Sequence, residues 1–194
     1  MATYTPREFE IPELDGISQK TIKEHLGLYQ GYVTNTNKIQ ELIDSGDVDD
    51  YALKETQRRL AFEFDGMRNH EYYFSLFEGG SKKLEDSPLL SKIDDQFGLF
   101  DDWLEYFKGS VAKTRGVGWA MLSYDTHTDQ LLNYWVDEQH LGHLTGVQPI
   151  ITLDMWEHSY CMDYAPSEKG QYIDAFFENI NWETAAGWYD EVKN

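Results

Sequence analysis

The feature that most constrains this fold is a change in hydrophobic period near the middle of the chain. Up to about residue 77, apolar residues recur every three or four positions, which is helical spacing. A first helix is predicted from Ser18, a favourable N-cap, to about Ile43, and a second from about Tyr51 to Phe77. Turn-forming residues separate the two, so the pattern predicts an antiparallel helical hairpin.

Beyond residue 90 the pattern shifts to short helices and then to strands. Residues 119–125 and 130–136 flank a turn and resemble a β-hairpin, residues 149–154 form a third brief strand, and helices return from about Gly170. We therefore predict an α+β fold. An N-terminal helical hairpin domain (1–80) and a linker (81–89) precede a C-terminal α/β domain (90–194) with a small three-stranded antiparallel sheet.

Composition narrows the class of partner. The formal net charge of −19 disfavours nucleic acid and anionic membrane surfaces, since little positive charge is available to neutralise phosphates. No stretch of about 18 apolar residues occurs, and the amino-terminal segment lacks a basic region followed by an apolar run. The single cysteine, Cys161, fits a reducing compartment or simply a small apolar position. We expect a cytoplasmic protein.

The segment around Asp154 and His158 carries the strongest chemical signal. These residues can share a helix face, or Asp154 can end the third strand while a turn brings His158 back to it. Taken alone, the pair is explained at least as well by a buried aspartate and a core histidine as by a metal site. His25 and His70, on the two predicted helices, add two imidazoles from separate elements. Three nitrogens and one oxygen suit iron, manganese or zinc, of which zinc cannot change redox state.

Several segments resemble the iron/manganese superoxide dismutase family over essentially the whole chain. The carboxyl-terminal signature of that family is similar to DMWEHSYCMDY, and its two helical segments are similar to SQKTIKEH and NHEYYF. Further matches are QFGLFDDW, GVGWAML and FFENINWE. The resemblance implies one iron or manganese ion per subunit, held by His25, His70, Asp154 and His158. It also implies a homodimer that disproportionates superoxide to dioxygen and hydrogen peroxide.

The resemblance also assigns residues around the ion. Tyr32 corresponds to the gateway tyrosine, and Trp119 and Trp156 to walls of the pocket. Gly66 leaves room on the second helix while Gln139 supplies the family's glutamine from the later domain, which is manganese-like. Thr152, by contrast, resembles the iron members. The metal is left open, with a slight preference for iron.

Three further positions follow from the same resemblance. Glu157 is expected to reach His158 of a partner subunit, and Cys161 stands where the family has a tyrosine at the dimer contact. Lys169 falls where the family often has arginine, so it either supplies local positive charge for an anionic substrate or is a solvated surface lysine.

Two other classes of function compete with this interpretation. His127 and Asp129 have the two-residue spacing of a mononuclear non-heme iron oxygenase, but they lie in a predicted hairpin turn. The second alternative is a non-catalytic metal-binding protein on the same scaffold. A carboxylate-bridged di-iron protein would need paired Glu-x-x-His motifs, which do not occur.

Overall fold

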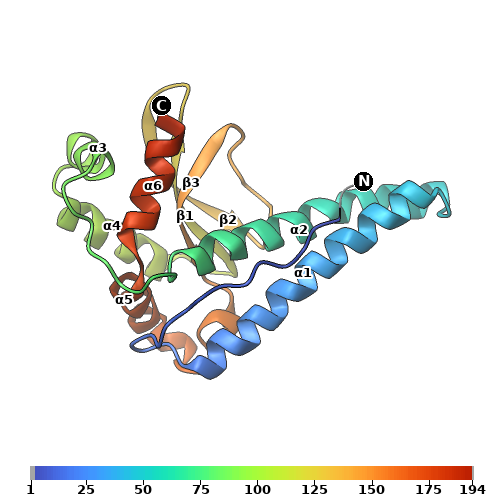
Figure 1. The fold of residues 1–194 in the computed structure, drawn as a ribbon, viewed down its shortest axis with the longest axis horizontal. Helices are drawn as coiled ribbons and strands as arrows, with labels where there is room; N and C mark the ends of the chain where they lie inside the picture. Colours follow the sequence, from blue (N-terminus) through green and yellow to red (C-terminus); the bar gives the residue numbers. More distant parts are fainter. Residues whose placement is uncertain (1–2, 194) are drawn as a thin grey trace.

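The first two helices form a long antiparallel hairpin in the computed structural model, which describes residues 3–193 (Figure 1). Helix α1 spans Gln19–Ser45 and α2 spans Asp50–Ser75. The Ser18 hydroxyl accepts a hydrogen bond from the Thr21 amide, so the predicted N-cap is confirmed. Gly46, with a φ of 65°, ends α1 in the left-handed conformation that glycine adopts without steric cost.

Three antiparallel strands form the sheet that was predicted. Strands β1 (Gly118–Asp125), β2 (Gln130–Asp137) and β3 (Val147–Asp154) lie in the order β2-β1-β3. Trp119 on the central strand pairs with Val136 on one side and Asp154 on the other. This register places Trp119 beside the last residue of β3 and next to the end of β2.

The remaining helices lie beside this sheet, on the side away from the turn that joins α1 and α2 (Figure 1). They are α3 (Pro88–Phe97), α4 (Phe100–Lys113), α5 (Lys169–Asn179) and α6 (Trp182–Lys193), with 3₁₀ turns η1 (Glu157–Ser159) and η2 (Pro166–Glu168). Helices α2 and α6 pack on β3, and η1 packs on α1. One continuous apolar core joins the hairpin to the sheet, containing for example Val33, Tyr73, Trp119 and Phe176. The division of the chain at residues 81–89 stays a prediction.

Within residues 3–193, no helix is both long enough and apolar enough to cross a membrane.

Candidate metal centre

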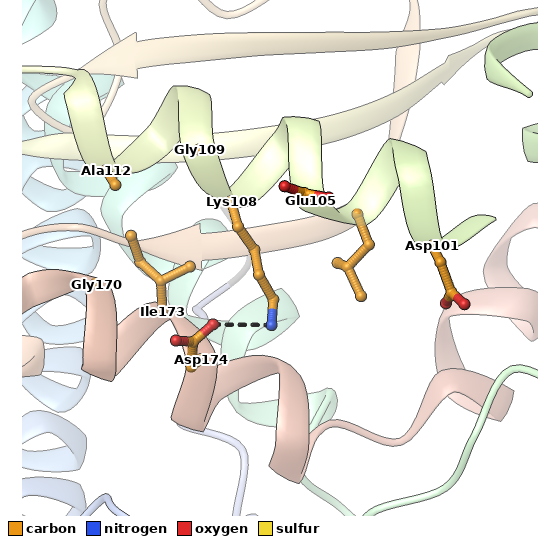
Figure 2. Close-up of a pocket in the computed structure, with 9 residues that line it drawn as sticks. Asp101, Glu105, Lys108, Gly109, Ala112, Gly170, Ile173 and Asp174 are labelled. Carbon is orange, nitrogen blue, oxygen red and sulfur yellow. Dashed lines mark hydrogen bonds and ion pairs between the residues drawn. The ribbon is translucent and has the colours of Figure 1, made fainter. Parts of the chain in front are cut away.

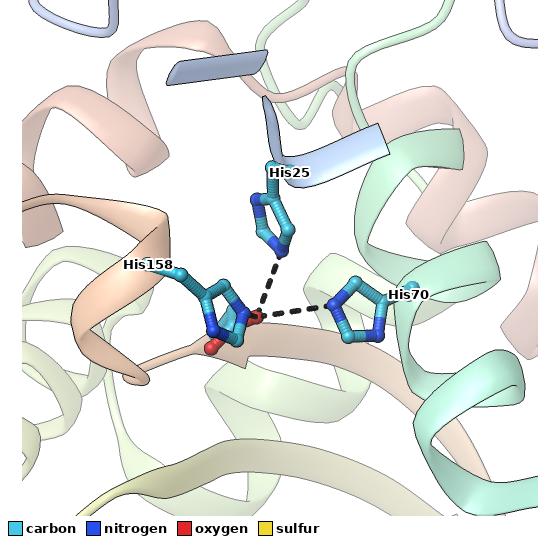
Figure 3. Close-up of side chains that lie close together, drawn as sticks. His25, His70 and His158 are labelled. Carbon is cyan, nitrogen blue, oxygen red and sulfur yellow. Dashed lines mark hydrogen bonds and ion pairs between the residues drawn. The ribbon is translucent and has the colours of Figure 1, made fainter. Parts of the chain in front are cut away.

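Four side chains from distant parts of the sequence converge near the open end of the hairpin, where α1 begins and α2 ends (Figure 3). The Nε2 atoms of His25, His70 and His158 lie 3.0, 3.7 and 3.1 Å from Oδ2 of Asp154. One donor atom from each of the four residues lies within 4.8 Å of the others. Ligands placed about 2.1 Å from a common ion stand at comparable separations, so the cluster fits a single metal ion.

Separate elements fix these four residues. His25 lies on α1 and His70 on α2, and neither ring is exposed to solvent. Asp154 is the last residue of β3, and η1 returns His158 to it. Of the two geometries that the spacing allowed, the structure has the strand end followed by a turn. The His158 side chain retains 21% exposure, so it lies on the side of the cluster nearest to solvent.

Hydrogen bonds orient the donor atoms toward one another. The Gly66 carbonyl accepts a hydrogen bond from Nδ1 of His70 at 2.5 Å, which leaves the Nε2 lone pair pointing into the cluster. The Trp156 amide donates to Oδ1 of Asp154 at 2.7 Å, which leaves Oδ2 for the three imidazoles. The hydroxyls of Tyr172 and Ser159 donate to the Asp154 carbonyl at 2.8 and 3.0 Å. The strand end is therefore held from several directions.

The protonation states also suit a metal site. Burial lowers the pKa of His25, and burial lowers the pKa of His70 to about 3. Burial alone would raise the pKa of Asp154, but its interactions with His158 and His25 outweigh this and hold that pKa well below its usual range. At neutral pH these two histidines are neutral and the carboxyl group is ionised, which are the forms that bind metal.

Aromatic side chains enclose the cluster. The ring centroids of Tyr32 and Trp119 lie 5.1 and 5.0 Å from that of His70, and Trp156 stacks on His158 at 5.7 Å. A Cβ atom at Gly66 would lie 2.6 Å from Cδ1 of Tyr32. The absence of a side chain at position 66 thus lets the Tyr32 ring lie against α2.

Gln139 bridges two of these aromatic residues. Its Oε1 accepts a hydrogen bond from Nε1 of Trp119 at 2.8 Å, and its Nε2 donates to the Tyr32 hydroxyl at 2.9 Å. Since the amide is the donor in the second bond, the hydroxyl proton of Tyr32 remains free to be donated elsewhere. Burial, with the charge of Asp154, raises the pKa of Tyr32, so the phenol stays protonated at neutral pH.

The structure gives no contact with the cluster for the side chains of the other predicted site residues. Thr152 is buried on β3, and its hydroxyl has no hydrogen-bond partner. Glu157 and Cys161 are exposed, so their predicted place in a dimer interface stays a prediction. Lys169 is half-buried and its ammonium donates to the Thr114 carbonyl at 2.6 Å, at the end of α4. Its role in attracting substrate also stays a prediction.

The rival ligand pair does not assemble into a site. His127 lies in the turn between β1 and β2, and Asp129 accepts hydrogen bonds from Tyr124 and Lys92. Across residues 3–193, the one group of three or more histidine, cysteine or acidic side chains arranged to hold a metal ion is the cluster described above. A facial triad built on His127 and Asp129 thus lacks its third ligand in this part of the chain.

A separate cavity of about 470 Å³ lies between α4 and α5 (Figure 2). It is lined by Leu104 and Ile173 among others, and Lys108 crosses it to reach Asp174 at 3.0 Å. None of the predicted site residues lines it.

Sequence reasoning missed two residues that bear on the site. Asn69 donates a hydrogen bond to the Gln139 carbonyl, and His143 contacts Asn69. The only signal in the sequence was that Asn69 precedes His70 and that His143 follows Gln139 by four residues.

Comparison with known proteins agrees with this geometry. A family model for the C-terminal domain of iron/manganese superoxide dismutases matches residues 85–187. The superoxide dismutase [Fe] of Aquifex aeolicus is 34% identical over 188 residues, which cover 92% of this chain and 87% of that protein. The chain belongs to the iron/manganese superoxide dismutase family.

Relatives named for either metal occur in this family. The superoxide dismutase [Mn] of Haloarcula marismortui is 33% identical, with 90% of this chain and 86% of that protein covered. The superoxide dismutase [Fe] of Cupriavidus metallidurans is 35% identical, with 93% and 92% covered. The helical hairpin and the three-stranded sheet agree with membership of this family. Because relatives are named for both metals, membership leaves the choice of metal open.

Proposed function

We propose that this protein is a superoxide dismutase in which His25, His70, Asp154 and His158 hold one iron or manganese ion. Two superoxide anions and two protons are converted to one dioxygen and one hydrogen peroxide. The observation that carries the proposal is the convergence of three imidazole nitrogens on one buried carboxylate oxygen. An ion held there would supply the one-electron redox change that the reaction requires.

The protein's own residues would set how charge and protons enter. Neutral imidazoles and one carboxylate place a single negative charge beside the ion, which limits the net charge of the occupied site. The Tyr32 hydroxyl, held by Gln139 and kept protonated by burial, stands at the edge of the cluster with a proton to donate. The aromatic rings of Tyr32, Trp119 and Trp156 surround the cluster, so only small molecules such as superoxide would reach the ion.

We also propose iron as the preferred ion, a homodimer as the assembly and the cytoplasm as the location. Thr152 supports iron through its likeness to the iron members, against the manganese-like pair of Gly66 and Gln139. The exposed face that carries Glu157 and Cys161 supports the dimer. A free thiol at Cys161 supports a reducing compartment.

The test is superoxide consumption by metal-free protein loaded separately with iron and with manganese, with occupancy measured by elemental analysis. We expect activity with at least one ion and the higher rate with iron. A fully loaded protein that consumes no superoxide with either ion would refute the function and favour a non-catalytic metal-binding protein. Asp154→Asn, loaded in the same way, is the control for activity from loosely bound metal.

A further inference from the structure

The loop that carries Gln139 is held in a backbone conformation that needs support. Glu138, directly before it, has a φ of 52°, a left-handed conformation uncommon for a residue other than glycine. The amide of Asp137 donates to the Leu141 carbonyl at 2.8 Å, and the Leu141 amide donates back to Asp137 at 3.1 Å. Trp156 Nε1 donates to the Glu138 carbonyl at 3.1 Å. The loop is therefore closed at its base and fixed on one side of Gln139.

Asn69 fixes the other side. Its side chain is 3% exposed, and Nδ2 donates to the Gln139 carbonyl at 3.0 Å. The same nitrogen lies 3.3 Å from Nε2 of His143. An amide nitrogen carries two hydrogens and offers no lone pair, so Nε2 of His143 must be the acceptor. His143 thereby fixes the second hydrogen of the amide group that fixes Gln139.

We propose that His143 is a positioning residue that acts through Asn69 to hold Gln139 between Trp119 and Tyr32. The inference rests on the proposed function for its effect on the reaction, but not for its structural content. Without an acceptor at position 143, the Asn69 amide can rotate away from the Gln139 carbonyl. The Gln139 side chain is then no longer held in place to accept from the Trp119 indole and to donate to the Tyr32 hydroxyl. The Tyr32 hydroxyl loses the hydrogen bond that orients it.

A histidine that only fills space would behave differently from one that accepts this hydrogen bond. His143→Leu removes the acceptor, whereas His143→Gln keeps an acceptor oxygen on a flexible side chain. His127→Leu, at an exposed turn, is the matched control for loss of a histidine elsewhere. The structural readout is the hydrogen-exchange rate of the Trp119 indole N–H in full-length protein loaded with zinc. Zinc is diamagnetic and suits the same donor set, and Trp119→Phe assigns the signal.

In His143→Leu we expect the Trp119 indole to exchange at least about tenfold faster and the kcat of the iron- or manganese-loaded enzyme to fall about 10- to 100-fold, the usual effect of removing an outer hydrogen-bond partner. His143→Gln should restore most of both quantities, and His127→Leu should change neither. Unchanged indole exchange in folded His143→Leu, or no rescue by glutamine, would overturn the proposal.

One measurement needs no variant. The ring ¹⁵N shifts of His143 in the zinc-loaded wild-type protein should show an unprotonated Nε2, and a proton on that nitrogen would also overturn the proposal. If the wild-type enzyme consumes no superoxide with either ion, the proposed function fails. The zinc-loaded measurements still decide whether His143 positions Gln139.

Discussion

The metal cluster and the Gln139 loop lie side by side, yet they are built in different ways. His25 and His70 project from helices, and Asp154 ends a strand, so regular backbone hydrogen bonds fix their positions. Gln139 lies on an irregular loop next to the strained Glu138 and depends on side-chain hydrogen bonds from Asn69 and Trp156. Three of the four proposed ligands thus stand on a long helix or a strand end, and His158 stands on the short turn η1, whereas Gln139 stands on a loop.

The two regions also differ in charge. The cluster buries an ionised Asp154 beside His25 and His70, which burial keeps neutral, so a bound cation would offset the charge of the carboxylate. The loop carries a neutral network in which the Gln139 amide has a partner for both its oxygen and its nitrogen. Changes in the cluster should therefore act on metal binding itself, and changes around the loop should act more weakly.

The largest expected effect is loss of metal from His70→Ala. The variant removes the Nε2 donor and also the hydrogen bond to the Gly66 carbonyl that orients it. We expect no iron or manganese to remain after dialysis, as measured by elemental analysis. His127→Ala is the control and should keep its metal. Full occupancy in His70→Ala would show that this histidine is not a ligand and would remove the distinction drawn between the two regions.

A smaller effect, on the free energy of unfolding, is expected from Gly66→Ala, because Gly66 lies against the Tyr32 ring. In Gly66→Ala the new Cβ would lie 2.6 Å from the Tyr32 ring, so either the ring or the helix must shift. Such overpacking costs about 1–3 kcal/mol, of which the better helix propensity of alanine recovers up to about 1 kcal/mol. We expect a net loss in the free energy of unfolding, measured by denaturant titration.

Gly31→Ala is the matched control for that variant. Gly31 also lies within a helix, but nothing lies within 4 Å of a Cβ atom placed there. This change should stabilise the protein by about 0.5–1 kcal/mol through helix propensity alone. If both variants gain stability equally, the Tyr32 ring does not depend on the missing side chain at position 66.

The same division separates what the sequence could predict from what it could not. Helical period and a serine cap predicted α1 from its start at Gln19, because local spacing decides a long amphipathic helix. The spacing of Asp154 and His158 left two geometries open, because only the pairing of β3 with β1 decides that Asp154 ends a strand. The residue types allowed a possible site of three nitrogens and one oxygen, and the family resemblance implied both the four ligands and the redox role.

The surroundings of Gln139 depend on contacts between residues far apart in sequence. Asn69 reaches Gln139 across 70 positions, and no local pattern encodes that hydrogen bond. The left-handed φ of Glu138 was equally hidden, since glutamate is not a residue that signals such a turn. The hydrogen bond from the Lys169 ammonium to the Thr114 carbonyl is a further contact of this kind, since 55 positions separate the two residues.

The smallest expected effect compares two carboxyl groups. Histidines hold the pKa of Asp154 low, whereas burial raises the pKa of Asp65, on α2, to about 6. Between pH 3.8 and about 6 the folded state therefore binds more protons at Asp65 than the unfolded state does. The stability that protonated Asp65 contributes is complete below pH 3.8 and is lost as the pH rises through about 6.

Asp65→Asn replaces this group with a neutral one of similar size, and denaturant titrations across pH 4–7 test it. The variant should unfold at a higher denaturant concentration than wild type above about pH 6, and the difference should vanish toward pH 4. Asp95→Asn, an exposed position on α3, should follow the wild-type curve throughout. A constant offset across the whole range would mean that Asp65 is ionised in the fold at low pH. In that case burial does not raise the pKa of Asp65, and the two carboxyl groups do not differ in the direction of their pKa shifts.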